Sequence, residues 1–287
     1  MKNKSFIAFI VSIFLALIAR ADEAIFTALE AESERDYTAA IKILKTLSKK
    51  EEGRNVLFYL ARAHYLSGDY SSASKVLERL HQNYSADGET HYLSGLVNLA
   101  LVNEVNIFKK VGMAKKALKS WESSVAADPK NIDSRYAIFA YYATAPKIAG
   151  GNVEVARVLM AQINGFDAGY GAMAAGQLFS KEGDYARAES AFQKATVLMN
   201  RAGPHFSLAQ FYMQTEQYNK VFSSIEKFFH LEKRWWDVDI TGAYLILAKA
   251  NAELGNIEEA RKMASRGLKK NPIKQIRREL EETLKSL

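Results

Sequence analysis

Cysteine is absent from this 287-residue sequence, and proline occurs only four times. The missing thiol excludes disulfides, thiolate metal sites, a cysteine nucleophile and a lipid-modified N-terminal cysteine. Because proline interrupts helices, its scarcity, together with a quarter of charged residues, fits a soluble helical protein. The formal net charge of +7 is modest for this length and gives no argument for nucleic-acid binding.

The sequence also lacks the short motifs that carry common enzyme chemistry. It has no H-E-x-x-H zinc motif, no Walker phosphate loop and no G-x-S-x-G nucleophile elbow. Gly169, Gly171 and Gly176 superficially resemble a phosphate loop, but no strand is predicted before them. The histidines lack metal-ligand spacing, so packing or surface roles are favoured for His64, His81, His91, His205 and His230. We therefore expect no enzymatic activity, no cofactor and no metal site.

Residues 1–21 have the pattern of a secretory signal peptide. Lys2 and Lys4 precede an apolar run from Phe6 to Ala19, and a small-x-small cleavage site follows at residues 19–21. The alternative, an uncleaved membrane anchor, is less favoured because the run is shorter than the roughly 20 residues that span a bilayer. We expect a mature chain from Asp22 that is periplasmic or secreted and has no stable membrane anchor.

The stretch from Gly176 to Ala195 predicts two helices joined by a tight turn. Gly183 is suited to end the first helix in a left-handed conformation, and Asp184 can cap the second through its carboxylate. Ala188, Phe192 and Ala195 recur at spacings of four and three, which places them on one buried face. A single hairpin cannot bury such a face, but stacked neighbours can.

This pattern resembles the tetratricopeptide repeat (TPR), a 34-residue helix-turn-helix unit with small and aromatic residues at fixed positions. Similar hairpins are predicted along the chain, and two pairs of tyrosines, Tyr37 with Tyr70 and Tyr185 with Tyr218, are each 33 residues apart. The predicted hairpins are 24–48, 55–83, 89–128, 132–164, one around 176–195, 203–230 and 240–270. The resemblance implies an all-α, right-handed superhelical solenoid of about seven hairpins in one domain, 22–287, with a capping helix at 273–286.

Two irregularities interrupt the repeat. About ten extra residues in the third hairpin predict an extended helix and loop around Leu101 to Gly112. In the fourth, Pro146 must end or kink the first helix, and the segment A-P-K-I-A-G-G from Ala145 to Gly151 is similar to one in a subset of bacterial exported TPR proteins. That second resemblance implies architecture and location more than function.

In TPR proteins the first helix of each hairpin lines a concave groove, so the resemblance implies a set of ligand-contacting positions. These candidate partner-binding residues are Phe58, Arg62, Tyr65, His91, Asn98, Tyr136, Tyr170, Met173, Gln177, Phe206, Gln210, Met213, Leu245 and Lys249. Aromatic, methionine and amide side chains dominate them. Packing between neighbouring helices is an equal alternative for several. For Trp235 and Trp236 between the last two hairpins, packing is favoured over anchoring a partner.

The leading hypothesis is a non-enzymatic scaffold or adaptor of the cell envelope that holds a peptide or protein partner in the groove. The alternative is a small-molecule or lipid-binding accessory protein of a periplasmic transport system. Both would use apolar burial with a few orienting polar groups, so the sequence leaves the choice open. No nucleic-acid partner is expected.

Overall fold

The computed structural model describes residues 21–287, and all regular structure in that range is helical. Contacts divide the chain into two compact units that meet in sequence between Ala127 and Asp128. The N-terminal unit is described here over residues 21–127 and the C-terminal unit over residues 128–287. The predicted signal peptide, apart from Ala21, lies outside the described residues. The prediction of a single domain over 22–287 stays a prediction.

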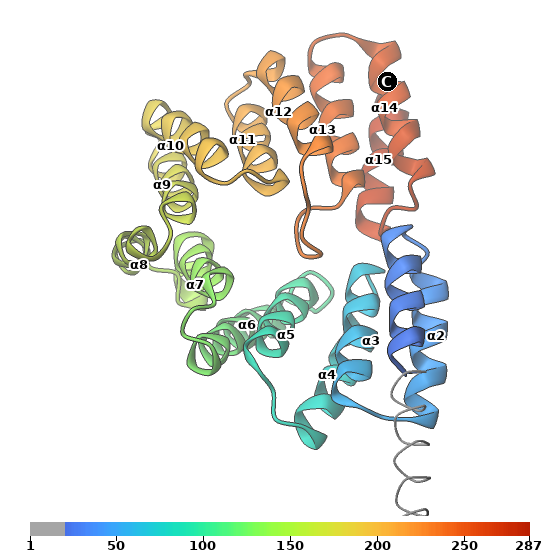
Figure 1. Cartoon of the computed structure of the whole chain (residues 1–287). Coiled ribbons are helices and arrows are strands. Elements are labelled where there is room, and N and C mark those ends of the chain that lie inside the picture. Colours follow the sequence, from blue (N-terminus) through green and yellow to red (C-terminus); the bar gives the residue numbers. More distant parts are fainter. Residues whose placement is uncertain (1–20) are drawn as a thin grey trace, which may run out of the picture. The chain divides into compact units, whose positions relative to one another are not determined.

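The N-terminal unit consists of consecutive helical hairpins (Figure 1). Residues 21–33 are helical and precede the second helix of the first hairpin. The following helices are α2 (Tyr37–Lys50), α3 (Arg54–Leu66), α4 (Tyr70–Asn83), α5 (Gly88–Leu101) and α6 (Ile107–Ala127). The hairpins α3/α4 and α5/α6 coincide closely with the predicted segments 55–83 and 89–128.

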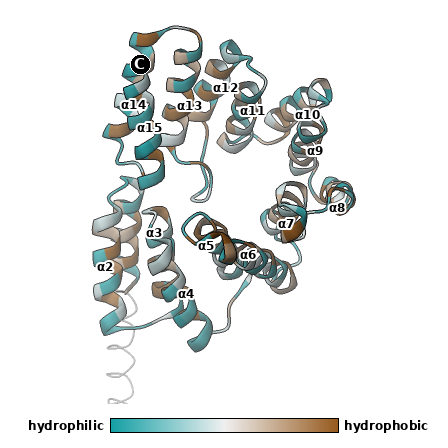
Figure 2. Cartoon of the chain, turned by 180° about the vertical axis from the view of Figure 1, so that it is seen from behind, coloured by the Kyte–Doolittle hydropathy of each residue, from teal (hydrophilic) through white to brown (hydrophobic). Residues whose placement is uncertain are grey.

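The C-terminal unit continues the same pattern with four hairpins and a final helix. Its helices are α7 (Ile132–Thr144), η1 (Lys147–Ala149), α8 (Val153–Phe166), α9 (Ala168–Glu182), α10 (Tyr185–Leu198), α11 (Ala202–Gln214), α12 (Tyr218–His230), α13 (Ile240–Glu253), α14 (Ile257–Lys269) and α15 (Lys274–Ser286). The final helix α15 packs on both α13 and α14 and is largely hydrophilic in Figure 2, as expected for a capping helix.

An aspartate-capped turn joins the helices of several hairpins. The side chain of Asp184 accepts a hydrogen bond from the backbone N–H of Arg187 at 3.1 Å, and Asp69 caps α4 in the same way. Gly183 has a φ of +81°, a left-handed conformation that costs least at glycine. The predicted turn and cap at these residues are therefore confirmed.

Each hairpin buries one small residue at the same place in its second helix. The side chain at this position has no exposed surface in any of the seven hairpins: Ala40, Ala73, Ala117, Ala156, Ala188, Val221 and Ala260. Such residues let the paired helices approach closely, and neighbouring hairpins then cover the exposed edges of the core. The predicted repeat register is confirmed along the whole described chain.

The third hairpin contains the predicted insertion. α5 ends at Leu101, a turn follows, and α6 extends over 21 residues, compared with 14 residues in α5. The two helices meet where the Trp121 indole packs directly on Gly95, and a Cβ atom at residue 95 would lie 2.1 Å from the indole Nε1. Glycine is therefore required at this contact because no side chain fits beneath the ring.

Pro146 ends the first helix of the fourth hairpin as predicted. α7 stops at Thr144, and the short helix η1 follows Pro146. The Tyr141 hydroxyl donates a hydrogen bond to the Ala149 carbonyl and so holds this turn against α7. The segment thus makes a wider turn between α7 and α8 than the other hairpins have.

Candidate functional site

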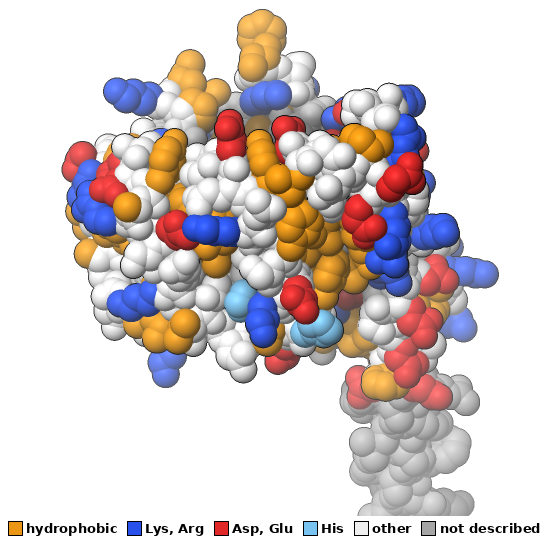
Figure 3. All heavy atoms as spheres, turned by 90° about the horizontal axis from the view of Figure 1, so that it is seen from above, with side chains coloured by type: hydrophobic (Ala, Val, Ile, Leu, Met, Phe, Trp, Pro, Cys, Tyr) orange, Lys and Arg blue, Asp and Glu red, His pale blue; other side chains and the backbone are white. Residues whose placement is uncertain are grey.

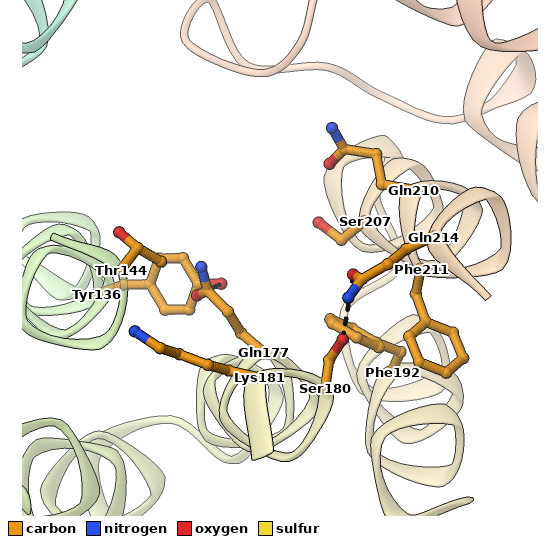
Figure 4. A pocket seen from close by; sticks show the side chains of 10 residues that line it. All are labelled: Tyr136, Thr144, Gln177, Ser180, Lys181, Phe192, Ser207, Gln210, Phe211 and Gln214. Carbon is orange, nitrogen blue, oxygen red and sulfur yellow. Dashed lines mark hydrogen bonds between the residues drawn. The ribbon is translucent and has the colours of Figure 1, made fainter. Parts of the chain in front are cut away.

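A pocket opens in the C-terminal unit between the first helices of three successive hairpins. Its volume is about 380 Å³, and we call it the glutamine pocket (Figure 4). Its lining residues are Tyr136, Thr144, Gln177, Ser180, Lys181, Phe192, Ser207, Gln210, Phe211 and Gln214. Most of these side chains can form hydrogen bonds, and Lys181 carries the lining's only formal charge.

Helical periodicity brings the polar side chains to one face. On α9 the lining residues Gln177, Ser180 and Lys181 are spaced by three and four, and such spacings place side chains on the same face of a helix. On α11 Ser207 and Gln210 are also three residues apart, with Gln214 one turn further along. The two helices therefore present parallel rows of amide and hydroxyl groups across the pocket.

Hydrogen bonds between neighbouring helices orient part of the lining. The Ser180 hydroxyl donates to the Gln214 side-chain oxygen at 3.2 Å, linking α9 to α11. The Tyr136 hydroxyl donates to the Gln177 side-chain oxygen at 3.2 Å, linking α7 to α9. With each amide oxygen used in this way, the NH₂ groups of Gln177 and Gln214 can donate to a ligand.

The groups in the lining of the glutamine pocket that can gain or lose a proton are the Tyr136 phenol and the Lys181 ammonium. Burial raises the pKa of Tyr136, so its phenol stays neutral and acts as a hydrogen-bond donor at physiological pH. The Lys181 ammonium donates to the Ala143 backbone carbonyl at the end of α7. The lining has no carboxylate, histidine or second lysine that could pair with these groups in proton transfer.

A polar cluster lies at the opposite ends of the same first helices. The connector between α12 and α13, residues 231–239, forms a long loop in Figure 1. Its Arg234 donates to Asp133 of α7 at 2.9 Å and to the Tyr170 hydroxyl of α9 at 2.7 Å. Tyr170 in turn donates to Asp133. The connector is thereby tied to helices far from it in sequence.

Burial raises the pKa of Tyr170 to about 12, and the nearby Asp133 carboxylate adds to the effect. The phenol consequently remains protonated and bridges the carboxylate and the guanidinium. A further contact joins the connector to α11, whose Ala202 N–H donates to the Glu232 carbonyl at 3.0 Å. The connector therefore covers the N-terminal ends of these first helices, whereas the glutamine pocket lies nearer their C-terminal ends.

The structure brings three of the candidate partner-binding residues together in the glutamine pocket. Tyr136, Gln177 and Gln210 all line it, and Gln210 is exposed. Tyr170 belongs instead to the polar cluster. Lys249 forms an ion pair with Glu279 of the capping helix at 2.8 Å. The binding role of these residues stays a prediction.

Several other candidates serve packing in the structure. Burial removes five of the fourteen side chains from solvent: Phe58, Tyr170, Met173, Phe206 and Leu245. The Phe206 ring, for example, lies 5.5 Å from that of Phe228 inside the hydrophobic core, and the half-buried Met213 packs against the same core. For the buried side chains the packing alternative applies, because a ligand cannot reach them without displacing their neighbours.

The candidates of the N-terminal unit each have a local partner. Arg62 donates to Glu32, which lies in the helical residues 21–33, at 2.9 Å, and the rings of Tyr65 and Tyr70 lie 5.7 Å apart. The His91 ring stacks on His81 at 5.1 Å. Asn98 of α5 donates to the Ser120 hydroxyl of α6 at 3.3 Å. These contacts join adjacent helices.

Sequence reasoning missed most of the polar lining of the glutamine pocket. The missed lining residues are Thr144, Ser180, Lys181, Phe192, Ser207, Phe211 and Gln214. A usable signal was present, because polar residues three and four positions from Gln177 and Gln210 must share their face. Asp133 and Arg234, which are 101 residues apart, had no such local signal.

Trp235 and Trp236 are half-buried in the connector, with ring centroids 5.1 Å apart in an edge-to-face arrangement. The Arg234 guanidinium lies 4.3 Å from the Trp236 ring centroid. This geometry agrees with the packing interpretation of both tryptophans.

Other kinds of site find little support in the part of the chain that the structure describes. Within residues 21–287 no three histidine, aspartate or glutamate side chains are grouped as metal ligands would be. None of the helices in that range combines the length and apolar character needed to cross a membrane. Figure 3 shows basic and acidic side chains interspersed over the face that it displays, without a broad patch of one sign.

Comparison with known proteins agrees with this architecture. Residues 55–86 and 172–196 match sequence models of the tetratricopeptide repeat. The fold is similar to that of a tetratricopeptide repeat protein from Parabacteroides merdae, at 16% identity and a TM-score of 0.56, over 92% of this chain and 97% of that chain. It is also similar to human IFIT1, solved as a dimer with PPP-AAAA, at 17% identity and a TM-score of 0.54, over 86% of this chain and 54% of that chain.

A search of the curated proteins found no match to the sequence. The solved structures share too little sequence with this chain to carry more than the fold. The chain therefore contains tetratricopeptide repeats at residues 55–86 and 172–196 and has the all-helical solenoid fold of TPR proteins.

Proposed function

We propose that this protein is a non-enzymatic scaffold of the cell envelope that binds an extended peptide segment of a partner protein in the glutamine pocket. The observation that carries the proposal is the lining of the pocket by Gln177, Gln210 and Gln214 on two adjacent first helices. TPR solenoids suit protein–protein interaction because stacked hairpins offer long, continuous surfaces.

Amide side chains match the chemistry of a peptide backbone. Each residue of an extended peptide presents one N–H donor and one C=O acceptor, and a glutamine can satisfy both. The neighbouring hydroxyls of Ser180 and Ser207 add further donors and acceptors. Phe192 and Phe211 are buried and form part of the pocket wall. The positive charge of Lys181 disfavours a cationic group on the bound segment, so an acidic or a neutral segment is expected.

The envelope location rests on the N-terminal sequence. Lys2 and Lys4, the apolar run from Phe6 to Ala19 and the small residues at the cleavage site support export by a signal peptide. The A-P-K-I-A-G-G segment, with its similarity to exported bacterial TPR proteins, supports the same location. We therefore place the mature chain in the periplasm or outside the cell.

The pocket lining gives less support to the lipid-carrier alternative. A lipid site is lined predominantly by apolar side chains. Here eight of the ten lining residues are glutamine, serine, threonine, lysine or tyrosine, the tyrosine with its hydroxyl bonded to Gln177, and only Phe192 and Phe211 are wholly apolar. The polar groups also point across the pocket in Figure 4.

The decisive experiment compares pocket variants as baits. The chain from Asp22 would be immobilised and exposed to envelope extract, and retained proteins would be quantified by mass spectrometry. Replacing Gln177 and Gln210 together by alanine should reduce retention of the specific partner about tenfold, since each lost hydrogen bond contributes about 0.5–1.5 kcal/mol. Loss of the exposed Gln210 should leave the melting temperature unchanged, whereas loss of Gln177 should lower it modestly, because the Tyr136 hydroxyl loses its acceptor.

Gln162→Ala provides the matched control, because Gln162 is exposed on α8 and does not line the pocket. It should retain the partner as the unaltered chain does. Equal retention by the double variant and the control would refute binding in the glutamine pocket.

A further inference from the structure

The first half of α6 is covered on one side only. Within residues 107–116 the side chains of Lys110, Val111, Met113 and Ala114 are half-buried, the other six residues are exposed, and the first fully buried residue of the helix is Ala117. At 1.5 Å per residue this segment is about 15 Å long. A Cβ atom at Gly112 would meet no other atom within 4 Å. One face of the segment, which includes Phe108 and Gly112, therefore lies open to solvent.

Two large apolar side chains stand at the tip of this segment. Phe108 is 91% exposed and Ile107 is 69% exposed. Phe108 lies nine residues from the buried Ala117, which at 100° per residue places the two on opposite sides of the helix. Water thus surrounds a phenyl ring that would be more stable in an apolar environment.

Lysines surround the same tip. Lys109, Lys115 and Lys116 are exposed within two turns of Phe108, and Lys119 follows on the same face as Lys115. The nearest acidic residues, Glu104 and Glu122, offset only part of this charge. Both are exposed, and within residues 104–122 they are outnumbered by Lys109, Lys110, Lys115, Lys116 and Lys119.

We propose that the first half of α6 is a peripheral membrane-binding element that inserts Phe108 and Ile107 into the interface of an anionic lipid surface. Lysines next to exposed apolar side chains are the pattern by which helices bind such surfaces, because the ammonium groups attract anionic headgroups while the apolar groups enter the acyl boundary. The contact is reversible and would bring the scaffold to a membrane without a spanning helix.

A lipid surface fits the tip better than a protein partner does. A stable protein interface buries roughly 20–30 residues on each side around an apolar centre. The tip offers two exposed large apolar residues on one helix face, which is too little for such a centre. A bilayer needs no matching shape, so a small apolar wedge among positive charges is sufficient.

The test is co-sedimentation of the chain from Asp22 with lipid vesicles. This chain keeps the described helices from α2 onward and removes the apolar run of residues 6–19, which would bind bilayers by itself. Vesicles of phosphatidylcholine with about 30% phosphatidylglycerol should sediment the protein, and pure phosphatidylcholine vesicles should not. Phe108→Ser should lower the partition coefficient about tenfold, because it removes the insertion of a phenyl ring. Lys115→Gln together with Lys116→Gln should lower it about tenfold or more.

Two matched controls distinguish this site from a general surface effect. Val197→Ser removes an equally exposed apolar residue of α10, which is 81% exposed, and Lys75→Gln removes an exposed lysine of α4. Both should bind anionic vesicles as the unaltered chain does, and all variants should keep its melting temperature. The proposal is overturned if anionic vesicles do not sediment the protein, or if Phe108→Ser binds them unchanged. Loss of a captured protein from the tip variants, with no vesicle binding, would identify a protein-docking site and would likewise overturn it.

Discussion

Replacing Gly95 by alanine tests the contact on which the third hairpin depends. Alanine is normally the better helix former, and in a helix interior the change should stabilise the chain by about 0.5–1 kcal/mol. Here the new Cβ atom would lie 2.1, 2.4 and 2.6 Å from three atoms of the Trp121 indole. Ordinary contacts are longer by more than an ångström, so the ring has to move.

Trp121 has little freedom to move, because it is only 2% exposed and lies between α5 and α6. Overpacking of this kind typically costs about 1–3 kcal/mol, and the rigid indole places this site toward the upper end. After the gain in helix propensity, we expect Gly95→Ala to lower the free energy of unfolding by roughly 1–2 kcal/mol. For a unit of this size each 1 kcal/mol lowers the melting temperature by roughly 4–8 °C, so it should fall by roughly 4–16 °C.

Gly112→Ala is the matched control within the same hairpin. Gly112 is also inside a helix, and a Cβ there meets nothing within 4 Å, so this variant should be as stable as the parent or slightly more stable. Thermal melts followed by circular dichroism compare the two variants, and amide hydrogen exchange in α5 and α6 assigns the loss to the third hairpin. If Gly95→Ala proves as stable as Gly112→Ala, the close approach of Trp121 to α5 is wrong.

Three further predictions follow from burial and charge. Ala188→Leu should cost about 1–3 kcal/mol because Ala188 has no exposed surface, whereas Ala186→Leu on the exposed side should be mild; equal melting temperatures would refute the register. Phe206→Ser should lower the melting temperature strongly, since deleting a buried phenyl ring costs about 3–5 kcal/mol. An unchanged melting temperature would instead support the interpretation that Phe206 lines the groove. Burial lowers the pKa of both His81 and His91, so the neutral rings stabilise the fold above pH 6.5 and that stability is lost as the pH falls below it. The double variant with His81→Gln and His91→Gln should lose less stability than the parent as the pH falls, as measured by denaturation at several pH values. An unaltered dependence of stability on pH would contradict this account.

The repeat architecture could be predicted because its determinants are local. A left-handed glycine, an aspartate cap and small residues at spacings of three and four each act within one hairpin. Gly183, Asp184 and Ala188 illustrate this, and all three occupy the predicted roles. The insertion in the third hairpin and the helix end before Pro146 were likewise predictable, since a changed spacing and a missing N–H are visible in the sequence.

The candidate site was predicted only in part. Three of the first-helix positions that the TPR resemblance implied, Tyr136, Gln177 and Gln210, line one pocket, but the pattern did not distinguish lining residues from packed ones. Phe206 sits at an equivalent position and is buried, because the neighbouring Phe228 covers it. The exposed fraction of a side chain depends on how closely the next hairpin packs, and no local sequence pattern contains that distance.

The sequence by itself determined the class of fold, the number and limits of the hairpins and the turn chemistry, because these follow from interactions between residues less than a repeat apart. Only the tertiary structure decided which part of the first-helix face the connector covers and where the glutamine pocket lies. Arg234 reaches Asp133 across 101 residues, and the connector thereby covers one end of the first-helix face while the glutamine pocket lies nearer the other. The physical reason is that this contact depends on how successive hairpins stack, and small rotations between repeats accumulate over several hairpins.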